Sequence, residues 1–158
     1  MAVIFTGTEI VGLGIEIEKN GKDFYETLAV QSKSDAVKKL FKYLAGEEEK
    51  HIAVFEKILN ASEKYEPAES YQGEYFSYLK ALAGECVFTK KGKGKEIAKN
   101  IKTDKEAVGV GIVFEKDSII FYDGMKKVVP EYDHKIINEL ISQEQNHLTQ
   151  LIELKEKL

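Results

Sequence analysis

Two copies of a Glu-x-x-His motif carry the clearest chemistry in this sequence, and they lie at Glu48–His51 and Glu144–His147. Residues three apart on an α-helix share one face, so each motif presents a carboxylate and an imidazole side by side. The chain has three histidines, and the motifs contain two of them. Both motifs interrupt an apolar stripe, where an unpaired carboxylate is costly to bury. The pattern therefore indicates a positively charged partner, and two such helices facing each other would present four ligands to metal.

Two further glutamates, Glu18 and Glu115, also lie on apolar stripes. Glu18 shares its stripe with Tyr25, and Glu115 shares one with Tyr122. A single inward glutamate is often a surface residue whose carboxylate reaches solvent. Here, however, the two halves of the chain repeat: Glu18 corresponds to Glu115 at an offset of 97 residues, and the two motifs correspond at an offset of 96. The repeat favours a common site.

Together these positions supply four carboxylates and two imidazoles. The candidate metal ligands are Glu18, Glu48, His51, Glu115, Glu144 and His147. Such an oxygen-rich set suits iron or manganese better than structural zinc. Four glutamates also balance the charge of two divalent ions, so the buried site becomes neutral. Glu47 and Glu49 flank the first motif off the ligand face and are expected to be solvated charges.

Helices have to position these residues, and the apolar spacing predicts four long ones. The first runs from a capping box at Thr6–Glu9 to about Val30, and the second covers roughly Asp35–Leu59. The third starts at another capping box, Thr103–Glu106, and the fourth starts at Pro130 and continues to the end of the chain. Two helical hairpins of this kind, joined by a long connection, make a four-helix bundle with one crossover.

The crossover between the second and third helices covers about residues 60–102. Its helical pattern is weak, and only Tyr75–Leu82 and Glu96–Ile101 resemble short helical pieces. Neither hairpin makes a complete core alone, so residues 1–158 are predicted to form one all-α domain.

Composition restricts the function classes. Hydrophobic residues make up 43% of the 158 and charged residues 32%, as in an ordinary globular protein. The net charge is −4, and acidic and basic residues are mixed along the chain without forming the basic patch that nucleic-acid binding needs. No apolar run approaches the length of a membrane span. The single cysteine, Cys86, excludes an intrachain disulfide and a CxxC metal site, and is expected to be a small buried residue. We expect a cytoplasmic protein.

The sequence resembles the rubrerythrin family of the ferritin-like di-iron carboxylate superfamily. The resemblance rests on Glu18–Tyr25, on Glu47–His51 and on the second Glu-x-x-His motif. It implies a ferritin-like bundle that binds two iron ions, for which manganese or zinc can substitute.

The resemblance also implies roles for individual residues. Glu48 and Glu144 resemble the bridging carboxylates, and the terminal ligands would be Glu18 with His51 and Glu115 with His147. Tyr25 and Tyr122 resemble phenols that hydrogen-bond to the ligands across the bundle, although each could equally be a core tyrosine with a satisfied hydroxyl.

Two departures from the family bear on function. Rubrerythrins carry an extra glutamate one turn from the third-helix ligand, whereas the turn-neighbours of Glu115 are Ile112 and Ser118. This counts against the ligand switching associated with rubrerythrin peroxidase activity. The rubredoxin domain of the family needs four cysteines, and the chain has one. Electrons are therefore expected from a separate donor such as a rubredoxin.

The expected function is reduction of hydrogen peroxide or dioxygen at a non-haem di-iron site. Iron storage with ferritin-type ferroxidase chemistry is the alternative within the same site. A metal-free helical interaction module is the alternative from another class. Aromatic residues in the crossover further suggest a homodimer, with a domain-swapped arrangement as one form of it; they are Tyr71, Tyr75, Phe76 and Tyr78.

Overall fold

The structure is a computed structural model, and it describes residues 7–62, 74–127, 129 and 131–158. The described residues form six α-helices and two short 3₁₀ turns, with no strand among them. The helices are α1 (Gly7–Gln31), α2 (Asp35–Ser62), α3 (Glu74–Glu85), α4 (Lys93–Asn100), α5 (Asp104–Met125) and α6 (His134–Glu156). The turns are η1 (Val87–Thr89) and η2 (Glu131–Asp133). The predicted all-α bundle with one crossover is confirmed.

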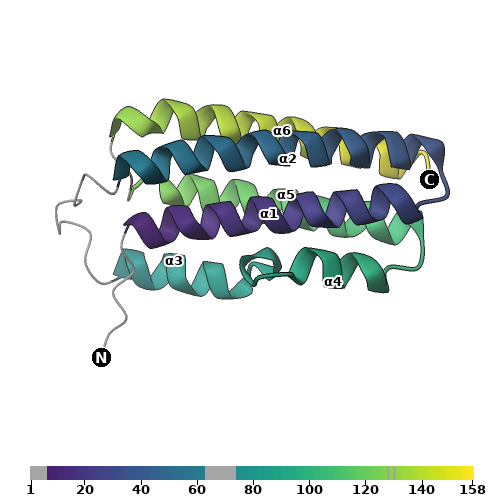
Figure 1. The fold of residues 1–158 in the computed structure, drawn as a ribbon, viewed down its shortest axis with the longest axis horizontal. Helices are drawn as coiled ribbons and strands as arrows, with labels where there is room; N and C mark the ends of the chain where they lie inside the picture. The colour runs from purple at the N-terminus through teal and green to yellow at the C-terminus, as the bar shows by residue number, and fades with distance from the viewer. Residues whose placement is uncertain (1–6, 63–73, 128, 130) are drawn as a thin grey trace.

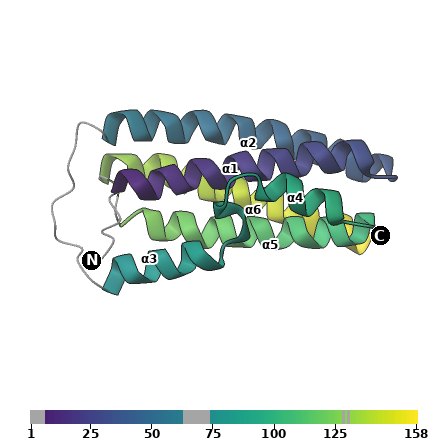
Figure 2. The ribbon, with the colours of Figure 1, turned by 60° about the horizontal axis from the view of Figure 1, so that its bottom comes forward.

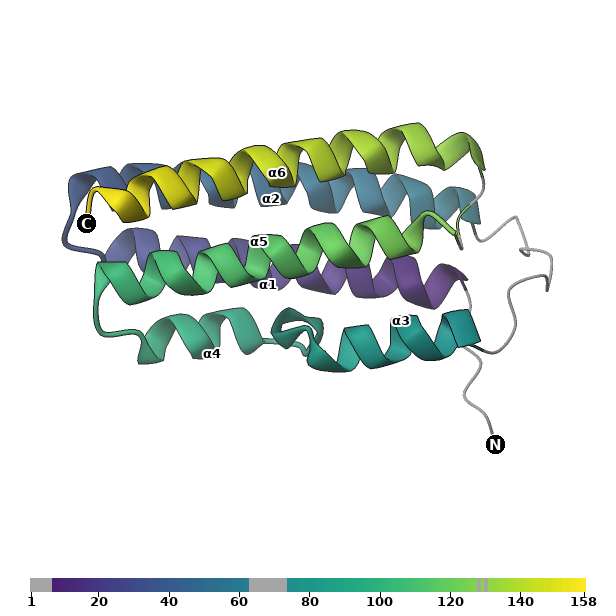
Figure 3. The same cartoon turned by 180° about the vertical axis from the view of Figure 1, so that it is seen from behind.

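Four of these helices make the bundle. Helices α1 and α2 form one antiparallel hairpin and α5 and α6 form the other, so that α2 lies beside α6 and α1 beside α5 (Figures 1 and 3). Helices α3 and α4 lie end to end along the outer side of the α1/α5 layer, away from α2 and α6 (Figure 2). The crossover therefore runs the length of the bundle, and α5 can start at the end where α1 meets α2.

Each bundle helix buries one apolar face. On α2 the buried positions follow helical spacing and include Val37, Phe41, Leu44 and Phe55, all with 0% exposure. Burial of one such side chain stabilises the fold by about 1.5–3 kcal/mol. None of the described helices is both long enough and apolar enough to cross a membrane.

The helix ends agree with the predicted capping signals in part. The Thr103 side chain accepts a hydrogen bond of 3.1 Å from the backbone N–H of Glu106, which confirms the predicted N-cap of α5. The last helix begins at His134, after η2, and not at the predicted Pro130, which lies outside the described residues. The N-terminal capping box also falls partly outside them, because Thr6 is not described.

A buried asparagine attaches the crossover to the bundle. Asn20 donates from Nδ2 to the carbonyl oxygens of Phe88 (2.6 Å) and Lys90 (2.8 Å), and its Oδ1 accepts from the N–H of Gly94 (3.0 Å). The backbones approach so closely that a Cβ on Gly94 would lie 1.9 Å from the carbonyl oxygen of Asn20. Asn20 follows Glu18 by two residues, so this attachment fixes the crossover next to one of the candidate ligands.

Candidate metal centre

The six predicted ligands meet in the middle of the bundle, and we call them the carboxylate cluster. Glu18 comes from α1 and Glu115 from α5, while α2 and α6 each supply a Glu-x-x-His pair. All six are at most 1% exposed. They form two overlapping groups whose ligand atoms lie within 4.8 Å of one another: Glu18, Glu48, His51 and Glu144, and Glu48, Glu115, Glu144 and His147.

Glu48 and Glu144 belong to both groups, and their oxygens divide between the two histidines. Nδ1 of His51 lies 3.1 Å from Oε1 of Glu144 and 3.6 Å from Oε2 of Glu48. Nδ1 of His147 lies 2.9 Å from Oε2 of Glu144 and 3.8 Å from Oε1 of Glu48. Each carboxylate thus offers one oxygen to each side, which is the geometry that a bridging ligand needs.

The other two carboxylates each lie beside one histidine. Oε2 of Glu18 is 3.5 Å from Nδ1 of His51, and Oε2 of Glu115 is 3.9 Å from Nδ1 of His147. The two imidazole rings stack at a centroid distance of 5.6 Å and an interplanar angle of 19°. This placement sets Glu18 beside His51 and Glu115 beside His147.

Two tyrosines donate hydrogen bonds to Glu115 and Glu18. Tyr25 on α1 donates a hydrogen bond of 2.6 Å to Oε1 of Glu115 on α5. In the mirrored arrangement, Tyr122 on α5 donates to Oε1 of Glu18 on α1. Burial, followed by the charge of Glu115 for Tyr25 and of Glu18 for Tyr122, raises the pKa of both phenols well above 10. Both phenols therefore stay protonated and act as hydrogen-bond donors.

Several polar atoms of the cluster are buried without a hydrogen-bond partner. They are Oε2 of Glu18, both carboxylate oxygens of Glu48, Nδ1 of His51, Oε2 of Glu115 and Oε1 of Glu144. Leaving one buried polar atom unsatisfied costs about 1–3 kcal/mol, and more for a charged group. These atoms are the ones directed toward the shared interior of the cluster. Their convergence and their chemistry fit a pair of divalent metal ions of the iron type.

Burial and charge repulsion inside the cluster shift the pKa values of its carboxyl groups. Bound metal ions would offset that repulsion. Burial and the charges of Glu18 and Glu144 raise the pKa of Glu48 well above 4.5, and burial with the charge of Glu18 raises the pKa of Glu144 to about 7. Burial also acts to raise the pKa of Glu18, but the neighbouring Glu48 carboxyl group and the charge of His51 outweigh burial and lower the pKa to about 2. Without divalent cations the cluster therefore retains protons that metal ions would displace.

Comparison with known proteins agrees with this geometry. A family model described as rubrerythrin matches residues 9–155 of the chain. The chain belongs to the rubrerythrin family. A search of curated proteins gave no match.

Among solved structures, the rubrerythrin-family chain is similar to a Thermotoga maritima protein described as a ferritin-like diiron-carboxylate protein. The two share 29% sequence identity, with a TM-score of 0.75 over 96% of this chain and 95% of the other. Family membership supports a diiron protein, and the buried Glu/His cluster is compatible with iron binding.

The surroundings of two polar residues near this rubrerythrin centre, Gln143 and Glu47, were not predicted from the sequence. Oε1 of Gln143 lies 2.7 Å from Nε2 of His51. Glu47, which was expected to be a solvated charge, is half-buried: its side chain is 16% exposed and pairs with the exposed Lys50 at 2.6 Å. The repeat offered a signal for both, because Glu47 and Gln143 are related by the same offset of 96 residues as the two motifs.

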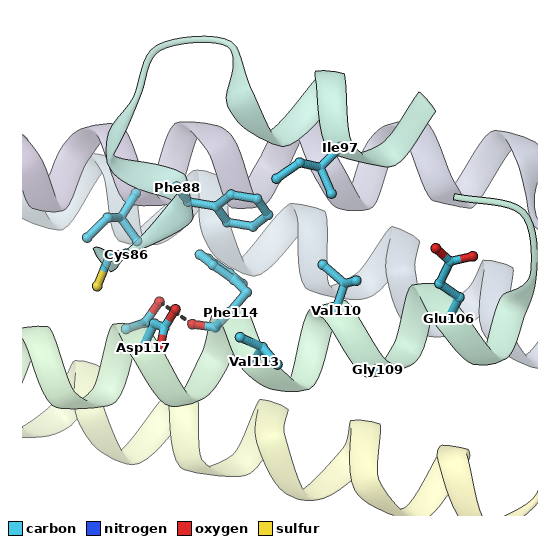
Figure 4. Close-up of a pocket in the computed structure, with 11 residues that line it drawn as sticks. Cys86, Phe88, Ile97, Glu106, Gly109, Val110, Val113, Phe114 and Asp117 are labelled. Atoms are coloured by element: carbon cyan, nitrogen blue, oxygen red, sulfur yellow. Dashed lines mark hydrogen bonds between the residues drawn. The ribbon is translucent and has the colours of Figure 1, made fainter. Parts of the chain in front are cut away.

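A groove of about 450 Å³ lies elsewhere, between α5 and the crossover, with Cys86 and Asp117 at one end and Glu106 at the other (Figure 4). No residue of the carboxylate cluster lines it. Burial, followed by the charges of Asp117 and Glu85, raises the pKa of the Cys86 thiol to about 12. Cys86 is therefore a buried, protonated thiol, which agrees with its interpretation as a small apolar core residue.

Proposed function

We propose that this rubrerythrin-family chain is a di-iron oxidoreductase that reduces hydrogen peroxide or dioxygen with electrons from a separate donor. The observation that carries the proposal is the convergence of six buried carboxylate and imidazole side chains. Several of their polar atoms have no hydrogen-bond partner. When bound, two ferrous ions would each supply one electron, so that one hydrogen peroxide and two protons give two waters.

The protein's part is to hold the two ions close together with fixed ligands. Glu48 and Glu144 would bridge them, because each directs one oxygen toward each histidine. Glu18 with His51 would complete one position, and Glu115 with His147 the other. The ligand atoms of each group lie within 4.8 Å of one another, which is close enough for them to share an ion.

The two tyrosines act by orienting these ligands. Because Tyr25 and Tyr122 each bind one oxygen of a terminal carboxylate, they leave the second oxygen directed inward. On α5, Ser118 donates its hydroxyl to the carbonyl oxygen of Phe114 at 3.0 Å and offers no carboxylate to the cluster. The proposed reaction therefore relies on the six residues in fixed roles and not on exchange of a ligand from that turn.

Iron storage would use the same ligands. It is distinguished from the proposed function by the size of the oligomer and by the number of iron atoms that each chain takes up. Storage requires uptake of many iron atoms per chain, whereas the proposed function needs two. A metal-free interaction module is disfavoured by the unsatisfied buried atoms, because burial of four carboxylates without counter-ions is costly.

A homodimer is part of the proposal, since Tyr78 of the crossover is 50% exposed. The side chains of Tyr71, Tyr75 and Phe76, which motivated the same expectation, lie outside the described residues. One chain brings all six ligands together, so the site can be assembled without domain swapping.

The test is anaerobic loading with ferrous iron, followed by metal analysis and titration with hydrogen peroxide or dioxygen. We expect two irons per chain, full oxidation by one equivalent of peroxide, and repeated turnover once a reduced rubredoxin is supplied. Binding of no iron, or oxidation no faster than that of free ferrous iron, would overturn the proposal. Sedimentation that detects only monomer at micromolar concentration would overturn the dimer.

A further inference from the structure

One imidazole of the carboxylate cluster has a hydrogen-bond partner on its outer side. Nε2 of His51, on α2, lies 2.7 Å from the side-chain oxygen of Gln143, on α6. On its inner side, Nδ1 of the same ring faces carboxylate oxygens of Glu144 at 3.1 Å, Glu18 at 3.5 Å and Glu48 at 3.6 Å. The ring is thus held between an amide and the interior of the cluster.

This arrangement determines which ring nitrogen can bind metal. A neutral imidazole carries its proton on one nitrogen and a lone pair on the other. The Gln143 side-chain oxygen can only accept, so it selects the form of His51 in which Nε2 carries the proton. Nδ1 then presents its lone pair toward Glu144, where a metal ion would be bound.

The second imidazole lacks the equivalent contact. The offset of 96 residues that relates His51 to His147 relates Gln143 to Glu47. Glu47 pairs with Lys50 at 2.6 Å, and no hydrogen bond joins it to His147 in the part of the chain that the structure describes. His147 instead meets the ring of Tyr43 edge-on, at a centroid distance of 6.2 Å.

We propose that Gln143 is a positioning residue that fixes the ring of His51 for metal binding, and that this one-sided contact makes the two metal positions unequal. The inference rests on the proposed di-iron function and adds to it an order of binding: the position at His51 fills first and holds its ion more tightly. Residues that orient a metal-binding histidine typically change metal affinity by about 10–100-fold when they are removed. Because Gln143 is exposed and water can partly replace it, we expect the lower end of that range.

Gln143 could alternatively serve only to join α2 to α6, and substitutions separate the two roles. Gln143→Leu removes the acceptor, whereas Gln143→Glu keeps an acceptor at the same reach. Gln145→Leu is the matched control, because Gln145 is an exposed glutamine two residues further along the same helix. If Gln143 served only in helix packing, Gln143→Leu would not weaken the binding of one ion selectively. Its metal binding would then resemble that of the Gln145→Leu control.

The experiment is a calorimetric titration of each purified protein with ferrous iron, combined with ¹⁵N NMR of the histidines in the zinc-loaded form. We expect Gln143→Leu to weaken one of the two binding steps about tenfold, to leave the other unchanged, and to lose the slowly exchanging Nε2 proton of His51. Gln143→Glu should keep that proton and the affinity, and Gln145→Leu should resemble the wild type.

Two outcomes would overturn the inference in different ways. If the wild type binds two ions and Gln143→Leu changes neither constant by more than about twofold, the positioning role is wrong and the di-iron function stands. If the wild type binds fewer than two ions, the proposed function fails and the inference fails with it. Should Gln143→Leu not fold, Gln143→Asn, whose amide is one methylene too short, replaces it in the same comparison.

Discussion

The hydroxyl of Tyr25 on α1 donates a hydrogen bond of 2.6 Å to Glu115 on α5, ninety residues further along the chain. The bond lies inside the bundle, where both residues have 0% exposure. Together with its mirror image between Tyr122 and Glu18, it joins the two hairpins at the level of the carboxylate cluster. The same groups thus stabilise the fold and orient the candidate ligands.

Removing this hydroxyl should therefore lower both stability and metal affinity. In Tyr25→Phe, Oε1 of Glu115 loses its donor in a buried site, which costs about 1–3 kcal/mol. Urea unfolding of the metal-free protein measures the free energy of unfolding, and iron titration measures the affinity. Tyr43→Phe is the control, because Tyr43 is 45% exposed. Equal stability of the two variants would contradict a structural role for the Tyr25 hydroxyl.

The contact between Asn20 and Gly94 gives a second prediction. Gly94→Ala would place a Cβ 1.9 Å from a backbone oxygen, so α4 has to move away from α1. Overpacking of this kind typically costs about 1–3 kcal/mol. Gly84→Ala, in the same crossover, meets no atom within 4 Å and should be neutral or slightly stabilising. Thermal unfolding of both variants measures the difference, and a Gly94→Ala protein as stable as Gly84→Ala would refute the close approach.

The bundle and its cluster could be predicted because helical spacing and the internal repeat fix which residues face inward. On α2, for example, the stripe that contains Phe41 and Leu44 also contains Glu48, and no tertiary information is needed to place them on one face. The repeat then relates that stripe to its counterpart on α6. Chemistry at regular spacing is therefore visible in the sequence itself.

The contacts that were missed depend on where the helices lie relative to one another. Nothing local distinguishes Asn20 from a solvent-facing asparagine until the crossover passes over it. Gln143 likewise looks like a surface residue on α6, and its partner His51 is known only when α2 lies alongside. The start of α6 was misplaced because η2 separates Pro130 from the helix, and a proline signal does not specify that intervening turn.

The raised carboxylate pKa values predict how pH affects the metal-free protein. Glu144 titrates with a pKa of about 7 in the folded state against 4.5 for the free side chain, so the folded state binds more protons between these values. Stability should therefore fall as pH rises from about 5 to above 7. Burial lowers the pKa of His51, but the charge of Glu18 outweighs it; the resulting raised pKa acts in the same direction above 6.5. Burial lowers the pKa of His147, so this group makes stability rise with pH below 6.5 and opposes the trend there.

Chelator-treated protein unfolded in urea between pH 5 and 8 provides the measurement for this pH effect. The expected loss for Glu144 alone is a few kcal/mol, because each pKa unit corresponds to about 1.4 kcal/mol. Metal-loaded protein is the control, since metal ions replace the protons and should reverse the trend. A metal-free stability that stays level or rises over this range would contradict the raised pKa values.

The bridging geometry of Glu48 predicts the largest effect of a single substitution. Each of its oxygens faces a different histidine, so Glu48→Ala removes a ligand from both proposed metal positions at once. We expect fewer than two irons per chain and a much smaller rise in melting temperature on metal addition. The reason is that metal ions stabilise the folded state only to the extent that the folded state binds them. Glu49→Ala is the matched control, because the neighbouring Glu49 side chain is 62% exposed and pairs with Lys22 at the surface. Metal analysis and calorimetry of both variants check this expectation. If Glu48→Ala retains two irons and the full metal-dependent rise in melting temperature, Glu48 does not bridge the ions.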